Sequence, residues 1–140
     1  MKVSDIKSQM EEALHFYATG KNDNGALAKE ILNNVNLQMP DGLTFEGQKA
    51  WGVILTFLVE HKMTSTGGCK AFYSPAMWKA RGEAYADGIL VVVYDGGDLG
   101  PCFGLDHECY KLHEEMRQAL EKAGFWAEEG TTWYSNIYLR

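Results

Sequence analysis

The sequence has no long hydrophobic run, only three cysteines and fewer basic than acidic residues, and each shortage excludes a class of protein. No apolar run approaches the roughly 18 to 20 residues that cross a bilayer. The first 30 residues also lack the apolar core of a signal peptide. Cys69, Cys102 and Cys109 cannot all pair within one chain, so a disulfide framework is not expected. We therefore expect a cytoplasmic protein that has no contact with a membrane.

The charge balance argues against direct nucleic-acid binding. The chain carries 13 basic and 19 acidic side chains, a formal net charge of −6. Proteins that bind nucleic acid by neutralising phosphates need the opposite excess. The acidity is concentrated late in the chain, because residues 71–140 carry a net charge of −5 and residues 1–70 only −1.

What the sequence does contain is typical of one compact domain. It has 140 residues, of which 46% are hydrophobic and 12% aromatic. Residues 1–66 have mainly helical periodicity, and most strand-like runs follow residue 70. No repeat, low-complexity tract or linker rich in Pro or Ser separates the two parts. We predict a single domain over 1–140, mainly helical over 1–66 and made of sheet plus helix over 67–140.

Three helices are predicted in the first part. The first has an apolar stripe at steps of three and four residues, formed by Val3, Ile6, Met10, Ala13, Leu14 and Tyr17. A second helix is predicted over 24–34 and a third over 45–62. The run 53–59 within the third would also suit a buried strand, but the longer pattern, which includes Glu46 and Lys49 as an i, i+3 pair, favours a helix.

The second part reads as strand–strand–helix–strand–strand, preceded by a short strand and helix. The predicted strands are 69–73, 89–94, 101–103, 125–128 and 132–139. The predicted helices run from Ser74-Pro75 to about Tyr85 and, capped by Asp106, over 107–123. Because strands and helices do not alternate regularly, the pattern favours an α+β fold, with an antiparallel sheet packed against helices on one face.

The tetrapeptide Asp95-Gly96-Gly97-Asp98 is the first candidate site. Two carboxylates after a buried strand could hold a divalent cation or act as an acid/base pair, with His107 as a candidate base. The glycines would let a ligand or another stretch of backbone approach closely. The same tetrapeptide is also typical of a turn between strands, and this interpretation is the stronger because the spacing places no further oxygen ligands.

Cysteine and histidine chemistry is less well supported. Cys109 and His113 share one helical face, but no spacing in the chain matches a zinc motif, so no metal is predicted. Cys69 follows a Gly-Gly pair and could be a nucleophile, although no histidine is placed beside it by sequence. Phosphate-binding glycine motifs are absent, which argues against nucleotide hydrolysis. We predict neither a catalytic residue nor a cofactor.

Aromatic side chains are concentrated in the second part of the chain. We interpret Tyr73, Trp78, Trp133 and Tyr134 as candidate binding residues, because tyrosine and tryptophan are enriched at interface hot spots. Tyrosines and tryptophans on both faces of the last strand also indicate a second covered surface. An edge strand of this kind could pair with a partner or with a copy of itself as a homodimer.

One part of the chain resembles a known group of proteins. The resemblance begins at Thr66-Gly67-Gly68-Cys69-Lys70-Ala71-Phe72-Tyr73-Ser74-Pro75 and continues through Trp78-Lys79-Ala80-Arg81-Gly82-Glu83. It includes Val91-Val92-Val93-Tyr94-Asp95-Gly96-Gly97-Asp98-Leu99 and Trp133-Tyr134-Ser135. Over residues 66–138 the chain resembles small hypothetical proteins of phages, prophages and other mobile elements. The resemblance implies a protein that binds or blocks a host factor, and it implies no activity.

Three classes of function follow from these observations. The favoured one is a non-catalytic interaction protein whose acidic, aromatic-rich second half binds a protein partner, because complementary charge selects partners. The first alternative is a metal-assisted hydrolase or small-ligand binder at Asp95 and Asp98. The second alternative is a structural homo-oligomer.

Overall fold

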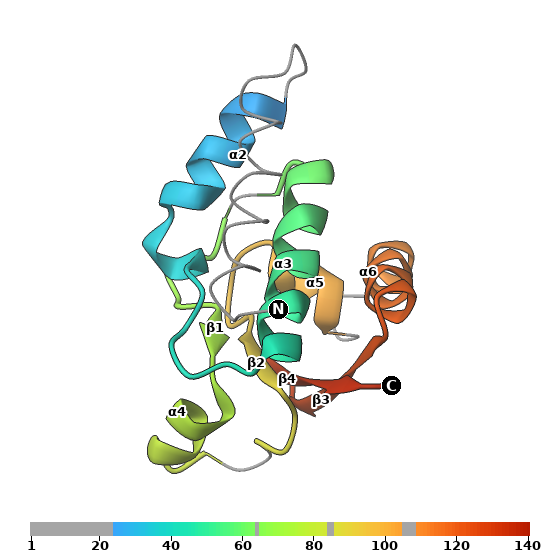
Figure 1. Cartoon of the computed structure of the whole chain (residues 1–140). Coiled ribbons are helices and arrows are strands. Elements are labelled where there is room, and N and C mark those ends of the chain that lie inside the picture. Colours follow the sequence, from blue (N-terminus) through green and yellow to red (C-terminus); the bar gives the residue numbers. More distant parts are fainter. Residues whose placement is uncertain (1–23, 64, 84–85, 105–108) are drawn as a thin grey trace.

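The computed structural model describes residues 24–63, 65–83, 86–104 and 109–140. The helix predicted from the apolar stripe in residues 3–17 lies outside these ranges. In chain order the elements are α2 (Asn24–Asn33), the 3-10 helix η1 (Val35–Leu37), α3 (Phe45–Glu60), β1 (Phe72–Tyr73), α4 (Pro75–Ala80), β2 (Leu90–Val93), α5 (Leu99–Phe103), α6 (Tyr110–Lys122), β3 (Phe125–Thr131) and β4 (Tyr134–Leu139), as Figure 1 shows. None of the described helices is long and apolar enough to cross a membrane.

The four strands form one antiparallel sheet in the order β1-β2-β4-β3. β2 is the apolar, β-branched run predicted to be central, and it lies between β1 and β4 with all four side chains buried. β3 is at one edge of the sheet, where it pairs with β4 alone among the described strands. The predicted α+β fold, an antiparallel sheet packed against helices, is confirmed.

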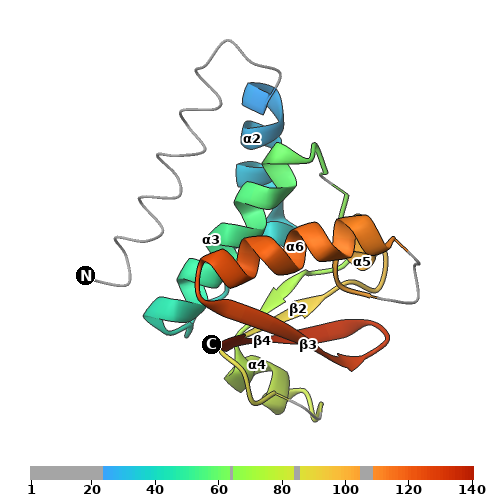
Figure 2. The same cartoon turned by 90° about the vertical axis from the view of Figure 1, so that its right-hand side faces the viewer.

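Helices cover both faces of the sheet (Figure 2). Successive side chains of a strand point to opposite faces, so Leu90 and Val92 join the main core with α3 and α6. Val91 and Val93 point the other way and pack against Trp78 of α4. The predicted packing of helices on one face is therefore incomplete, because α3 and α6 cover one face and α4 covers the other. The last strand, β4, lies between β2 and β3, so the expectation that it is an edge strand is wrong.

The helical interpretation of residues 45–62 is confirmed by α3. Thr44 begins the helix, because its hydroxyl oxygen accepts a hydrogen bond from the Gly47 amide at 3.1 Å. The Trp51 indole N–H donates to the Leu37 carbonyl at 3.0 Å, which ties α3 to η1. α2 also agrees with its predicted range to within one residue.

Two elements predicted around the sheet are wrong, one in its length and the other in its type. The helix that starts at Pro75 ends at Ala80 rather than Tyr85, and Gly82 then takes a left-handed φ of +84° that an α-helix cannot contain. The predicted strand 101–103 is the helix α5. Its buried residues, Leu99, Cys102 and Phe103, have the i, i+3, i+4 spacing of one helix face.

In the C-terminal hairpin the first strand is longer than predicted and the second begins two residues later, and the last helix is shorter than predicted. β3 continues to Thr131 through a register shift between Glu129 and Thr131, so the connection is Thr132-Trp133 rather than 129–131. α6 begins at Tyr110 with Cys109 at its N-cap position. The predicted cap, Asp106, lies outside the described residues.

Candidate interaction surface

The four aromatic residues singled out from the sequence lie in one cluster around α4. The Trp78 ring centroid is 4.9 Å from those of Tyr73 and Tyr134 and 5.6 Å from that of Trp133. Trp78 is 0% and Tyr134 1% exposed, so both belong to the second core. Tyr73 and Trp133 are half-buried and pack around them. The cluster therefore holds α4 on the sheet, and Trp78 and Tyr134 present no surface to a partner.

Basic side chains cover the outer side of this cluster. Arg81 donates a hydrogen bond to the Tyr73 hydroxyl at 2.9 Å, and its guanidinium carbon lies 4.7 Å from the centre of the Trp78 ring. The Lys70 ammonium lies 5.1 Å from the centre of the Tyr73 ring. These are cation–π contacts within the chain, and they use the aromatic faces internally.

The Asp95–Asp98 loop is held against the loop that contains Ser65. The Asp98 carboxylate accepts a hydrogen bond from the Ser65 amide at 2.9 Å, and the Asp98 amide donates to the Ser65 carbonyl at 2.8 Å. A Cβ added to Gly97 would lie 2.5 Å from the Ser65 carbonyl oxygen. Asp95 is exposed, whereas the carboxylate of Asp98 binds the neighbouring loop. This geometry supports the turn interpretation of the loop.

The described ranges contain no candidate metal site. No three His, Cys, Asp or Glu side chains gather there in a way that could hold an ion. His107, the candidate base, belongs to residues 105–108, which the structure does not describe.

The environments of two cysteines disfavour the thiolate form. Burial, followed by the Asp95 carboxylate, raises the pKa of Cys69, whose thiol donates to the Thr66 carbonyl at 3.0 Å. Burial, with a smaller contribution from Asp98, raises the pKa of Cys102 to about 12. A nucleophilic cysteine needs a lowered pKa, so neither environment activates its thiol.

A partly exposed aromatic pair lies on the outer hairpin of the sheet. Trp126 of β3 and Tyr138 of β4 are directly opposite each other, and their rings stack with centroids 4.6 Å apart and planes inclined by 21°. Trp126 is 40% exposed. Sequence reasoning did not select this pair, because cross-strand neighbours are known only once the register of the hairpin is known.

Carboxylates lie beside the Tyr138 side of this aromatic pair. A hollow of about 400 Å³ beside Tyr138 is lined by Asp87, Glu128 and Glu129 together with Gly130 and Asn136. Burial, followed by the Glu128 and Asp87 carboxylates, raises the pKa of Tyr138. We call Trp126, Tyr138, Asp87, Glu128 and Glu129 the acidic aromatic patch.

A second hollow lies on the other side of the hairpin. It has a volume of about 380 Å³, and its walls include Phe103 of α5, Met116 and Leu120 of α6, and Ala127 of β3. Glu128 and Glu129 line this hollow as well as the first, so both hollows reach β3. The larger part of its surface is apolar.

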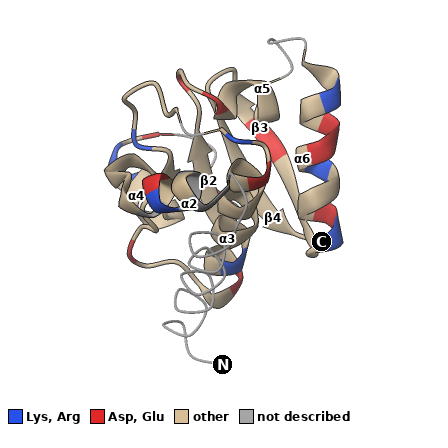
Figure 3. Ribbon diagram, turned by 90° about the horizontal axis from the view of Figure 1, so that it is seen from above, with Lys and Arg blue, Asp and Glu red and all other residues tan. Residues whose placement is uncertain are grey.

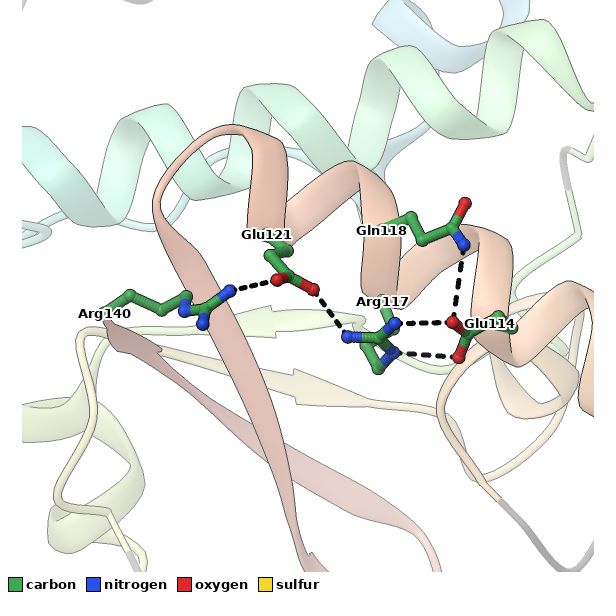
Figure 4. A network of polar contacts seen from close by, with 5 residues as sticks. All are labelled: Glu114, Arg117, Gln118, Glu121 and Arg140. Carbon is green, nitrogen blue, oxygen red and sulfur yellow. Dashed lines mark hydrogen bonds and ion pairs between the residues drawn. The ribbon is translucent and has the colours of Figure 1, made fainter.

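Acidic and basic residues alternate along α6 (Figure 3), and several of their side chains form a network of ion pairs. Arg117 donates to Glu114 at 2.8 Å and also to Glu121, as Figure 4 shows. Glu121 in turn pairs with Arg140 at the end of the last strand. The network joins α6 to the end of β4, so these carboxylates are paired with basic side chains.

The chain matches no protein-family model, and no curated protein or solved structure shows significant similarity to it.

Proposed function

We propose that this chain is a non-catalytic protein-interaction domain and that the acidic aromatic patch binds a basic segment of a partner protein. The observation that carries the proposal is the stacked pair of the exposed Trp126 and the half-buried Tyr138, with Asp87, Glu128 and Glu129 beside Tyr138. Large aromatic side chains contribute strongly at interfaces because they bury much area with few rotatable bonds.

Charge gives the patch its preference for a partner. A lysine or arginine placed over the Trp126 face gains cation–π attraction, and it gains ion pairing from Glu128 on the same side of the hairpin. The net charge of −6 would attract a basic partner at long range and repel an acidic one. The resemblance to proteins of mobile elements adds a narrower prediction, that the partner is a host factor which the chain blocks.

Nothing in the described site geometry favours the hydrolase alternative over this proposal. The Asp98 carboxylate binds the Ser65 amide, and the cysteine environments raise thiol pKa values. An interaction domain needs neither an activated nucleophile nor a metal.

Titration with nine-residue oligolysine, compared with oligoglutamate of equal length, tests the proposal. We expect oligolysine alone to shift the NMR signals of the Trp126 indole and the Tyr138 amide, and we expect added salt to weaken binding. The double variant Asp87→Asn/Glu128→Gln should bind at least about fivefold more weakly, a loss of about 1 kcal/mol. Trp126→Ala should also weaken binding.

Glu30→Gln/Glu60→Gln is the matched control, because it removes two charges from exposed positions on α2 and α3. It should bind oligolysine nearly as well as the unmodified chain. If this control loses as much affinity as the patch variant, or if oligolysine does not bind, the patch is not the binding surface.

A further inference from the structure

The hollow of about 380 Å³ beside α6 has a buried inner wall and a charged rim. The inner wall comes from three elements and consists of residues that are at most 3% exposed: Cys102 and Phe103 of α5, Met116 and Leu120 of α6, and Ser135 of β4. Small-molecule sites usually have volumes of about 300 to 1,000 Å³. We propose that this hollow binds a small hydrophobic amine, with the apolar body inside and the ammonium group at Glu128. The site goes beyond the proposed function, because it takes a small molecule rather than a protein segment.

The inner wall favours an apolar ligand body. Its two polar side chains have hydrogen-bond partners within the chain. The Cys102 thiol donates to the Asp98 carbonyl at 3.5 Å. The Ser135 and Tyr94 hydroxyls share a hydrogen bond of 2.8 Å. An apolar body in the hollow therefore leaves neither side chain as an unpaired buried polar group, and the Met116 thioether adds a favourable contact for an aromatic ring.

The rim carries more carboxylates than basic groups. Arg117 is exposed on the α6 side of the rim, where it donates to Glu114 at 2.8 Å and also to Glu121 (Figure 4). Glu121 pairs with Arg140 as well, and Glu128 is exposed on the β3 side. The ion-pair network and Glu128 together hold two arginines and three glutamates. This excess of negative charge favours a cation over an anion at the rim.

The inner wall and the rim together define the class of ligand. A fully apolar molecule gains nothing from the charge of Glu128, and a small polar cation gains nothing from the apolar wall. A body of about one aromatic ring, joined to an ammonium group by a short chain, uses both features. Ala127 lines the hollow and points to the opposite face of the hairpin from Trp126, so the body of the amine does not lie on the stacked aromatic pair.

Three probes that share one ring and differ in charge test this site. Phenethylamine is a cation, phenethyl alcohol is neutral and 3-phenylpropanoate is an anion. In methyl NMR at low ionic strength, we expect phenethylamine at up to about 10 mM to shift the Met116 signal but not that of Met63, which does not line the hollow. It should bind about fivefold more tightly than the alcohol, a difference of about 1 kcal/mol. The anion should bind more weakly than both.

Two variants separate the inner wall from the rim. Ala127→Leu extends a side chain into the hollow from β3, so it should abolish the Met116 shift with all three probes. Ala26→Leu makes the same change at an exposed position of α2, and it should leave binding unchanged. Glu128→Gln should remove the preference for the amine over the alcohol, while the alcohol binds as before.

The contrary outcomes are distinct from those of the proposed function. No Met116 shift at about 10 mM phenethylamine, or equal affinity for the amine and the alcohol, would overturn the proposal. A shift of the Trp126 indole without one at Met116 would place the amine on the acidic aromatic patch, which overturns this site and supports the patch. If thermal unfolding shows that Ala127→Leu does not fold, the comparison of Glu128→Gln with the unmodified chain decides.

Discussion

Glycine in the Asp95–Asp98 loop is required by a contact with another loop. Gly97 has a φ of +77°, and an added Cβ would lie 2.5 Å from the Ser65 carbonyl oxygen. Gly68 has a similar φ of +80°, but an added Cβ would have no heavy atom within 4 Å. We expect Gly97→Ala to lower the free energy of unfolding by about 1 to 3 kcal/mol more than Gly68→Ala, measured by urea unfolding. Equal losses would show that the loop contact is not tight.

The buried thiol of Cys102 predicts a change of stability at high pH. Burial raises its pKa from 9.0 to about 12, so above pH 9 the unfolded chain loses this proton while the folded chain keeps it. The contribution of Cys102 to stability is therefore complete below pH 9 and is lost as the pH rises toward 12.

The Cys102→Ala variant isolates this contribution from the other groups that titrate in the same range. Its free energy of unfolding should fall less steeply above pH 9 than that of the unmodified chain, by up to about 1.4 kcal/mol per pH unit. Urea unfolding at several pH values measures both slopes. Parallel pH profiles would mean that the thiol ionises equally in both states.

α4 is an element that depends on a single side chain. It has six residues, which is too short for a stable isolated helix, and Trp78 anchors it to the sheet. We expect Trp78→Ala to cost about 3 to 5 kcal/mol, because it empties a fully buried site. Trp126→Ala should cost about 1 kcal/mol, because the indole is 40% exposed. Thermal and urea unfolding of both variants measure the difference, and similar losses would contradict the assignment of Trp126 to the surface.

The elements that sequence reasoning identified are those with a strong local pattern. α3 and β2 have long or uniformly apolar runs, and both were predicted in the correct class. The run Pro101-Cys102-Phe103 alone favours a strand, and the helical spacing of α5 is evident only when Leu99 is included. The sequence predicts an α4 that is too long, because it does not show that Gly82 takes a left-handed φ.

The sequence predicts which residue types form the candidate site, but not which residues come together in it. An acidic, aromatic-rich second half is evident from composition, but Trp126 and Tyr138 become neighbours only through the register of β3 with β4. Asp87 joins them from a segment about 40 residues away in the chain, which no local spacing indicates. The selected residue Tyr134 lies on the same face of β4 as Tyr138, but Trp78 of α4 packs over it.

At the scale of the whole molecule, the helices that the structure describes leave the outer part of the β3–β4 hairpin partly exposed. α3 and α6 cover one face, α4 covers the β2 side of the other, and the outer part of the β3–β4 hairpin carries the exposed Trp126 (Figure 2). Exposed edge strands invite pairing with another chain unless charge prevents it. Under the proposed function, Glu128 and Glu129 would link the acidity of the chain to the basic partner that we propose.

Neutralising this edge should change the association of the chain with itself. We expect the unmodified chain to sediment as a monomer at low ionic strength, because pairing of two β3 edges would bring four carboxylates together. The variant Glu128→Thr/Glu129→Thr keeps strand propensity and removes the repulsion, so it should form dimers or larger species at high protein concentration. Glu30→Thr/Glu60→Thr, which makes the same changes on α2 and α3, is the control and should stay monomeric. A dimer of the unmodified chain whose Ala127 and Glu129 amides are protected from exchange would instead identify the homo-oligomer as the natural occupant of this edge.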